Sequence, residues 1–197
     1  MAQYNNIFKI THNDLLPAQG SILISEPFLQ DVYFQRGVVL LIEHTKDGSM
    51  GLVLNKKTDL LVNTFFPELK ELPDIPIYLG GPVCANRLFF MHSLGELIIP
   101  GAMKLKEDLY FDGDFEAMKR YILNGHSVKG KIKFFLGYSG WTKGQLNGEI
   151  EKNSWIVSHA ENNVMSAEGE SFWKHSLEVL GSSYKTWTNY PKDPYLN

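Results

Sequence analysis

Short uninterrupted runs of apolar residues recur along the chain and predict buried β-strands. Residues 37–44 and 49–55 are two such runs, and Asp47-Gly48 lies between them. Because an Asp-Gly pair readily adopts the positive φ of a tight turn, this pattern predicts a β-hairpin over residues 37–55. Similar runs predict strands at 21–26, 75–79, 87–92, 131–137 and 154–158, and shorter strands at 96–99 and 109–111.

Apolar residues at helical spacing predict helices, mostly in the second half of the chain. Residues 114–123 carry Phe115, Met118 and Ile122 on one face, and Asn124-Gly125 closes the segment. The same spacing predicts helices over 143–152 and 168–180, and residues 59–66 form one or two helical turns. A short turn over 32–35 is expected to be capped by Asp31.

The order of these elements indicates an α+β fold. The strands cluster early, without regular helices between them, which disfavours a doubly wound parallel sheet. We therefore predict one compact domain over residues 1–197, with a mostly antiparallel or mixed sheet and three to four helices packed on it. Residues 1–14 form a polar lead-in. Residues 182–197 form an aromatic-polar tail that either straps over the domain surface or docks as a peptide-like segment.

Composition narrows the class of protein. The chain is 44% hydrophobic and 21% charged, which is typical of a soluble globular protein. The single cysteine, Cys84, excludes an internal disulfide and is expected to be buried and inert. No apolar run approaches the roughly 20 residues of a membrane span, and the N-terminus lacks a signal-peptide core, so we expect a cytoplasmic protein without membrane contact. A net charge of −3 argues against a protein that mainly wraps nucleic acid.

Standard catalytic and cofactor signatures are absent from the sequence. It contains no P-loop, no dinucleotide-binding glycine pattern, no nucleophile elbow and no paired-cysteine zinc pattern. We therefore predict no cofactor and no metal. His44 and His92 end predicted strands, a position from which side chains often face a site. A hydrogen-bonded structural histidine is the default interpretation, and a general base or zinc ligand is the alternative for His44.

Three lysines alternate along the predicted strand 131–137 and the residues before it. Lys129, Lys131 and Lys133 would share one face, with Ile132 and Phe134 pointing inward. The favoured interpretation is a solvated face, and contact with phosphates of a nucleic acid is the alternative. Because no basic recognition helix accompanies the lysines, direct nucleic-acid binding is disfavoured.

Residues 140–155 contain the most distinctive group of side chains. Gln145 and Glu149 lie four residues apart, so a helix places them on the same face. Trp141 and Trp155 flank that helix. The group either forms a wall and polar contacts for a ligand, or packs the helix structurally, which is the interpretation we favour.

Three motifs follow one another along the chain. They are residues 20–27 with Asp31, 34–36, 38–44 and 51–55, then 80–83 and 88–92, then 137–141, 144–146, Glu149 and 153–155. In these motifs and in their order, the chain resembles the bacterial AlgH/YqgE-like family. The resemblance covers residues 15 to 180, and it implies a compact α+β domain around a strongly bent sheet. Members are often labelled transcriptional regulators, but the resemblance carries over no catalytic residue.

Three classes of function remain open at this level. A non-enzymatic binding or regulatory module, acting on a protein partner or a small ligand, is favoured over an enzyme or a weak nucleic-acid binder. The enzyme alternative is a hydrolase whose polar site, near the hairpin, gathers Asp31, Arg36, His44 and Asn55. The complete candidate site comprises Asp31, Arg36, His44, Asn55, His92, Trp141, Gln145, Glu149, Asn153 and Trp155.

Overall fold

The computed structural model describes residue 11 and residues 13–192, and these form a single α+β domain. Most of the predicted lead-in over residues 1–14 therefore lies outside the described residues. The strands are β1 (Ser21–Ser25), β2 (Val38–Thr45), β3 (Gly48–Val53), β4 (Lys57–Leu61), β5 (Pro76–Leu79), β6 (Val83–His92), β7 (Met103–Lys106), β8 (Leu109–Phe111), β9 (Ile132–Thr142) and β10 (Trp155–His159). The helices are α1 (Val62–Phe65), α2 (Phe115–Leu123), α3 (Gln145–Glu151), α4 (Gly169–Val179) and α5 (Ser182–Lys185), with short 3₁₀ turns η1 (Pro67–Leu69), η2 (Val164–Ser166) and η3 (Thr186–Asn189).

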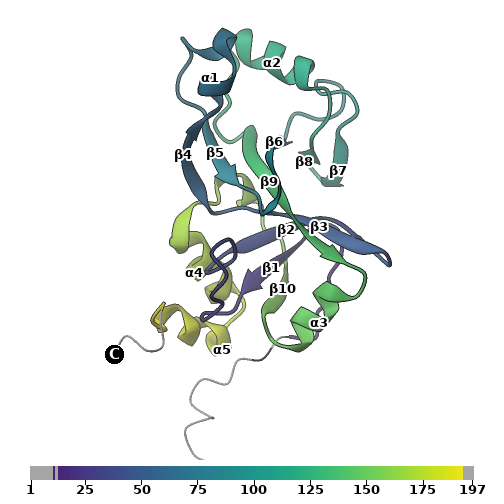
Figure 1. The fold of residues 1–197 in the computed structure, drawn as a ribbon, viewed down its shortest axis with the longest axis vertical. Coiled ribbons are helices and arrows are strands. Elements are labelled where there is room, and N and C mark those ends of the chain that lie inside the picture. The colour runs from purple at the N-terminus through teal and green to yellow at the C-terminus, as the bar shows by residue number, and fades with distance from the viewer. Residues whose placement is uncertain (1–10, 12, 193–197) are drawn as a thin grey trace, which may run out of the picture.

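One long strand, β9, joins two halves of a largely antiparallel sheet (Figure 1). Its C-terminal end pairs with β3, which continues through β2 and β1 to β10. Its N-terminal end pairs with β6 on one side and, in parallel, with β5 on the other. Helices α1 and α2 lie in the half built on β5 and β6, whereas α3, α4 and α5 lie in the other half (Figure 1).

The bend of β9 depends on Gly137, which lies between the two paired ends. Gly137 has a φ of 68°, a left-handed conformation that side chains with a Cβ adopt rarely. A Cβ built at this position would lie 2.5 Å from the carbonyl oxygen of Gly81. Gly80, Gly81 and Gly137 therefore allow two backbone segments to cross at close range.

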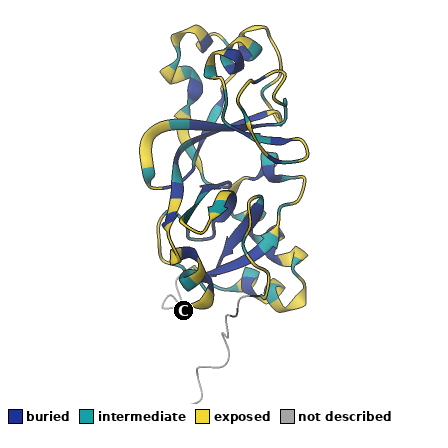
Figure 2. Cartoon of the chain, turned by 90° about the vertical axis from the view of Figure 1, so that its right-hand side faces the viewer, coloured by how far each residue is buried: buried dark blue, intermediate teal, exposed yellow. Residues whose placement is uncertain are grey.

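The predicted hairpin over residues 37–55 is confirmed as β2 and β3. Both faces of β2 are buried, because its residues alternate between two apolar clusters. Val38, Leu40 and Ile42 face the large central cluster that α4 covers, and Val39 and Leu41 face the cluster under α3. A third apolar cluster packs α1 and α2 against the other half of the sheet. Figure 2 shows that buried residues gather in the strands and on the inner sides of the helices, whereas the loops are mostly exposed.

The predicted helices over 114–123, 143–152 and 168–180 correspond to α2, α3 and α4. The Asp114 side chain caps α2 by accepting a hydrogen bond from the backbone N–H of Ala117 at 3.0 Å. The helix expected over 59–66 is confined to α1, because β4 takes the first part of that segment by pairing with β5. The predicted strand at 96–99 is wrong, since these residues form turns and Leu97 is fully exposed.

Cys84 is exposed rather than buried. The pairing of β6 with β9 shifts register between Val83 and Leu88, so this part of β6 leaves the regular ladder. Cys84 itself has a φ of 49° in this irregular stretch. The apolar appearance of the segment did not reveal the bulge that turns it toward solvent.

The described part of the tail, residues 182–192, packs against the domain through α5 and η3. Trp187 is 3% exposed and joins the central cluster, and the ring of Tyr190 stacks on Phe28 at 5.4 Å. Residues 193–197 lie outside the described residues. In the part of the chain that the structure covers, no helix is both long and apolar enough to cross a membrane.

Candidate functional site

The side chains around α3 form a closed cluster of Trp141, Glu149 and Trp155, which we call the Trp–Glu cluster. The indole N–H groups of both tryptophans donate to the same oxygen, Glu149 Oε2, at 2.8 Å each. Glu149 Oε1 accepts from the amide of Gln145 at 3.0 Å, which confirms that the two residues share a helix face. Leu146 and Ile150 are buried beneath them. Every donor named here is satisfied within the chain, so this arrangement is suited to fixing α3.

The remaining predicted residues near α3 lie at its margins. Asn153 follows the helix in a left-handed conformation, with a φ of 64°. His44 lines a shallow hollow beside the start of α3, and its Nδ1 is 2.7 Å from the hydroxyl of Ser49.

His92 lies in the other half of the sheet, where its Nε2 is 3.2 Å from the carbonyl oxygen of Asp112 and its ring stacks on Tyr110. Burial lowers the pKa of His92, which favours its neutral form.

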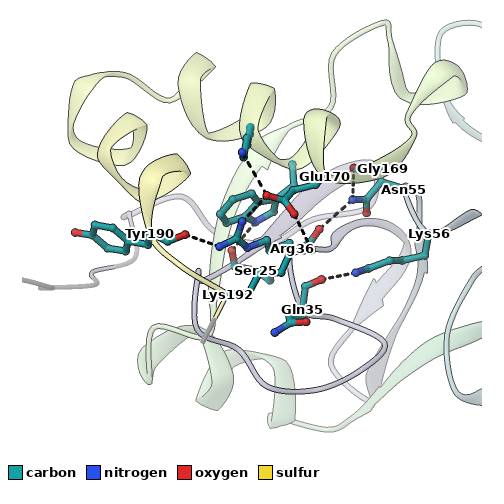
Figure 3. Close-up of polar contacts among 11 residues, drawn as sticks. Ser25, Gln35, Arg36, Asn55, Lys56, Gly169, Glu170, Tyr190 and Lys192 are labelled. Carbon is teal, nitrogen blue, oxygen red and sulfur yellow. Dashed lines mark hydrogen bonds and ion pairs between the residues drawn. The ribbon is translucent and has the colours of Figure 1, made fainter. Parts of the chain in front are cut away.

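A second polar group surrounds Arg36 and Asn55 (Figure 3). The Arg36 guanidinium is 5% exposed, pairs with Glu170, donates to the carbonyl of Tyr190 and lies 5.0 Å from the centre of the Trp173 ring. Asn55 binds three backbone groups, which hold the end of β3 against the start of β2 and of α4. We call the 290 Å³ depression here the Arg36 hollow; it is lined by Gln35, Arg36, Asn55, Lys56, Lys57, Glu168, Gly169, Glu170 and Lys192.

Charge is strongly paired in the Arg36 hollow. Burial by itself would raise the pKa of Glu170, but hydrogen bonds from Lys192 and Arg36 and the charge of Arg36 outweigh it and lower the pKa to about 2. Lys174 and Lys192 also contact Glu170 at 3.3 and 3.0 Å. Two of these partners, Arg36 and Lys192, connect the tail to the hairpin, so the hollow is tied together by the chain's own groups.

The residues of the predicted hydrolase site do not all lie close together in space. Arg36 and Asn55 lie together, and the Asp31 carboxylate accepts from the backbone N–H groups of Tyr33 and Phe34 in the next turn. His44 lies near the other end of β2, six residues beyond Val38, which corresponds to about 20 Å along a strand. The histidine is therefore too far away to act on a group bound at Arg36.

The predicted solvated row of lysines is broken by the burial of Lys133. Lys133 is only 4% exposed, because β9 is a central strand with both faces covered. Its Nζ donates to the carbonyl of Ala167 and lies 3.8 Å from the centre of the Tyr78 ring. Lys129 and Lys131 remain exposed before the strand begins. The alternation placed Lys133 outward because it cannot distinguish a covered face from a solvated one.

A groove of about 790 Å³ opens beside Lys133, and we call it the Lys133 groove. Its walls come from the segment before β5, the loop after α2, the start of β9 and η2. Apolar surface dominates, and the Tyr78–Glu168 pair lies in the wall with Lys133. The lining residues are Lys57, Leu72, Pro73, Asp74, Ile75, Pro76, Tyr78, Ile122, Gly125, His126, Ser127, Val128, Lys129, Gly130, Ile132, Lys133, Met165, Ser166 and Glu168.

Hydrogen bonds and charges couple four groups in this wall. The Tyr78 hydroxyl donates to Glu168 Oε2 at 2.8 Å, and Lys57 pairs with Glu168 Oε1 at 3.2 Å. Burial, together with the hydrogen bond and charge of Glu168, raises the pKa of Tyr78. Burial lowers the pKa of Lys133 to about 7, although the charge of Glu168 acts in the opposite direction. Near neutral pH, the lysine is therefore divided between its amine and ammonium forms.

Sequence reasoning missed this group because Tyr78, Lys133 and Glu168 are far apart in the chain. The available signal was a single cation inside the apolar run of residues 132–136. In a strand buried on both faces, such a residue has to find a polar partner inside the protein. Among the described residues, no group of three or more histidine, cysteine, aspartate or glutamate side chains is placed to hold a metal ion.

Comparison with known proteins places the chain among close relatives. A UPF0301 protein from Parabacteroides distasonis is 73% identical over 198 residues and covers the whole of both chains. A relative from Bacteroides fragilis is 50% identical, across 98% of this chain and 97% of its own.

Solved structures agree with the fold described above. The solution structure of the AlgH protein from Pseudomonas aeruginosa has 29% sequence identity and a TM-score of 0.69, and covers 91% of this chain and 98% of its own. A crystal structure of a Corynebacterium diphtheriae protein has a TM-score of 0.71, with coverage of 91% and 94%; at 22% identity it supports the fold alone. The AlgH-like family model matches residues 22–185. The chain therefore belongs to the AlgH-like family, as its three sequence motifs predicted.

Proposed function

We propose that this protein is a non-enzymatic binding module whose ligand occupies the Lys133 groove. The ligand is a small, largely apolar molecule with one polar head group. The observation that carries this proposal is the conjunction of a 790 Å³ groove with apolar walls and a buried lysine in its lining. A volume of this size lies within the range of about 300–1,000 Å³ that is usual for small-molecule pockets.

The distribution of polar groups supports a ligand in this groove. Ligand sites usually combine apolar walls with a few fixed polar groups that orient the bound molecule. Here Lys133, Tyr78 and Glu168 supply those groups, and most of the exposed surface of the groove is apolar. The Arg36 hollow is smaller, and its two glutamates, Glu168 and Glu170, are already paired with cations of the chain, so it is the weaker candidate.

Direct recognition of DNA or RNA is not part of the proposal. The net charge is −3, and the lysine row for which phosphate contact was the alternative interpretation has Lys133 buried in the interior. A regulatory role would instead act through the ligand, whose binding would alter the surface around the groove. A cytoplasmic location, where small metabolites are available, fits the single exposed cysteine.

A thermal-shift experiment with three matched probes tests the proposal. Hydrocinnamate, hydrocinnamyl alcohol and hydrocinnamaldehyde share one apolar body and differ in the head group. A probe at about 100 times its dissociation constant adds roughly 2.7 kcal/mol to the free energy of unfolding. For a domain of this size, that corresponds to a rise of roughly 5–10 °C in the midpoint.

Two tryptophan variants localise the effect. Ser127 is exposed at the rim of the groove, so Ser127→Trp obstructs the groove without removing a core contact. Ser183 is exposed on α5 and does not line the groove, so Ser183→Trp is the matched control. The proposal requires a probe that stabilises the wild type and Ser183→Trp but not Ser127→Trp. Equal shifts in all three proteins, or no shift with any probe, would contradict it.

A further inference from the structure

We propose that the amine of Lys133 forms a reversible imine with the carbonyl carbon of an apolar aldehyde or ketone held in the Lys133 groove. This inference rests on the proposed binding function and names the chemistry of its ligand. The lysine would then be the covalent anchor of the site rather than only a hydrogen-bond donor.

Lys133 lies where a ligand in the groove can approach it. Lys133 belongs to the groove lining and is only 4% exposed, so its side chain borders the groove from a largely covered position. The Tyr78 ring and the Ala167 carbonyl hold Nζ on two sides. A bound molecule that fills the apolar part of the groove would meet this nitrogen with little freedom, which is the condition for an efficient reaction between neighbouring groups.

The protonation state of Lys133 also favours imine formation. Only the uncharged amine attacks a carbonyl carbon, and an ordinary lysine with a pKa near 10.4 is uncharged at pH 7 in roughly one molecule in a few thousand. Burial lowers the pKa of Lys133 to about 7, so about half of the molecules carry the amine. Lysines that are desolvated in apolar pockets are nucleophiles for the same reason.

The reaction balances without an oxidant or a reductant. The lone pair of Nζ forms a C–N bond to the carbonyl carbon, and the carbonyl π electrons move to oxygen. Protons pass from nitrogen to that oxygen, which leaves as one molecule of water when the C=N bond forms. The Glu168 carboxylate lies in the same wall, accepts a hydrogen bond from the Tyr78 hydroxyl at 2.8 Å, and its charge acts on Lys133. Hydrolysis by water reverses the sequence.

Reductive trapping tests the imine directly. The full-length protein is treated with hydrocinnamaldehyde and cyanoborohydride at pH 7, and the modified lysine is identified by peptide mass spectrometry. We expect Lys133 to be modified at least about 100-fold faster than an exposed lysine, because a lysine with the ordinary pKa near 10.4 is almost fully protonated at pH 7. Its rate should level off above about pH 7, while the rates of exposed lysines continue to rise toward pH 10.

Two variants and one unreactive probe make the result decisive. Lys133→Met keeps a side chain of similar length without an amine and should abolish the fast modification. Ser127→Trp keeps Lys133 but obstructs its groove, and should slow the modification at least about tenfold. It therefore also keeps the test valid if Lys133→Met fails to fold. Modification spread over exposed lysines, with Lys133 no faster than the rest, would overturn the imine.

Hydrocinnamyl alcohol separates the two proposals, since it has the same apolar body but no carbonyl. If the alcohol stabilises the wild type and not Ser127→Trp, while Lys133 stays unmodified by the aldehyde, the imine is wrong and the binding function stands. If the alcohol gives no stabilisation that depends on the groove and the aldehyde does not modify Lys133, both proposals are wrong.

Discussion

The Trp–Glu cluster and the Lys133 groove contain the same kinds of side chain but leave them in different states. Each combines aromatic rings with a half-buried or exposed glutamate that accepts hydrogen bonds from them. In the Trp–Glu cluster, both indole N–H groups end on Glu149, and buried aliphatic residues fill the space behind them. In the groove, a buried amine lies beside a space of about 790 Å³.

This difference distinguishes polar side chains that stabilise the fold from polar side chains that are placed to bind a ligand. A polar group inside a filled cluster, with its partners supplied by the chain, stabilises one arrangement and has no room beside it for a ligand. A buried ionisable group beside open space is different, because burial disfavours its charged form and a ligand can occupy the space next to it. The first arrangement was the more conspicuous in sequence, and the second is the better candidate for function.

The largest expected effect is the loss of stability on removing the carboxylate of the Trp–Glu cluster. Glu149→Ala leaves the N–H groups of two buried tryptophans, Trp141 and Trp155, without their acceptor. At a cost of about 1–3 kcal/mol for each unsatisfied group, we expect a total loss of about 3 kcal/mol in urea unfolding. Glu149→Gln retains an acceptor oxygen and should lose clearly less. A loss below about 0.5 kcal/mol for Glu149→Ala would show that the cluster is not structural.

Replacing the lysine of the groove should have a pH-dependent effect. The pKa of Lys133 is about 7 in the folded protein and about 10.4 when unfolded, so the unfolded chain binds more protons between these values. The free energy of unfolding of the wild type therefore rises across this window, and that of Lys133→Met lacks the contribution. The difference between variant and wild type should fall by roughly 3 kcal/mol from pH 7 to pH 10. A difference independent of pH would mean that Lys133 is not desolvated.

Glu170 of the Arg36 hollow should show a pH dependence of the same sign, but in an acidic window. Its pKa falls from an ordinary value of 4.5 to about 2, so its contribution to stability is present above pH 4.5 and is lost as the pH falls toward 2. Glu170→Gln should therefore destabilise the protein by about 2 kcal/mol at pH 6, after allowance for a side chain that is 29% exposed, and by much less at pH 2. Equal destabilisation at both pH values in urea titrations would contradict this assignment.

The smallest effect is expected at the solvent side of the Trp–Glu cluster. Gln145 is exposed; it donates to Glu149 at 3.0 Å and accepts from the backbone of Thr142 at 3.0 Å. Gln145→Ala leaves the water-accessible partners free to hydrate, so we expect a loss of about 0.5 kcal/mol. A loss as large as that of Glu149→Ala would show that Gln145 orients the carboxylate.

Sequence patterns predicted those elements that depend only on residues close together in the chain. The hairpin follows from Asp47-Gly48, and the shared face of Gln145 and Glu149 follows from their spacing on a helix. Burial of Lys133 and exposure of Cys84 depend on strand pairing and on a bulge, which alternation along one strand does not encode. The groove was missed because its walls come from segments that are separated by many residues in the chain.

Chemical-shift mapping of the labelled protein with hydrocinnamyl alcohol tests the central claim most directly. If the Lys133 groove is the ligand site, the perturbed backbone amides should gather at residues 72–78, 125–133 and 165–168, and those of α3 should stay unchanged. The same titration on Ser127→Trp should leave the groove amides unperturbed. Perturbations concentrated at α3 and the Trp–Glu cluster, or an identical pattern in Ser127→Trp, would contradict the account.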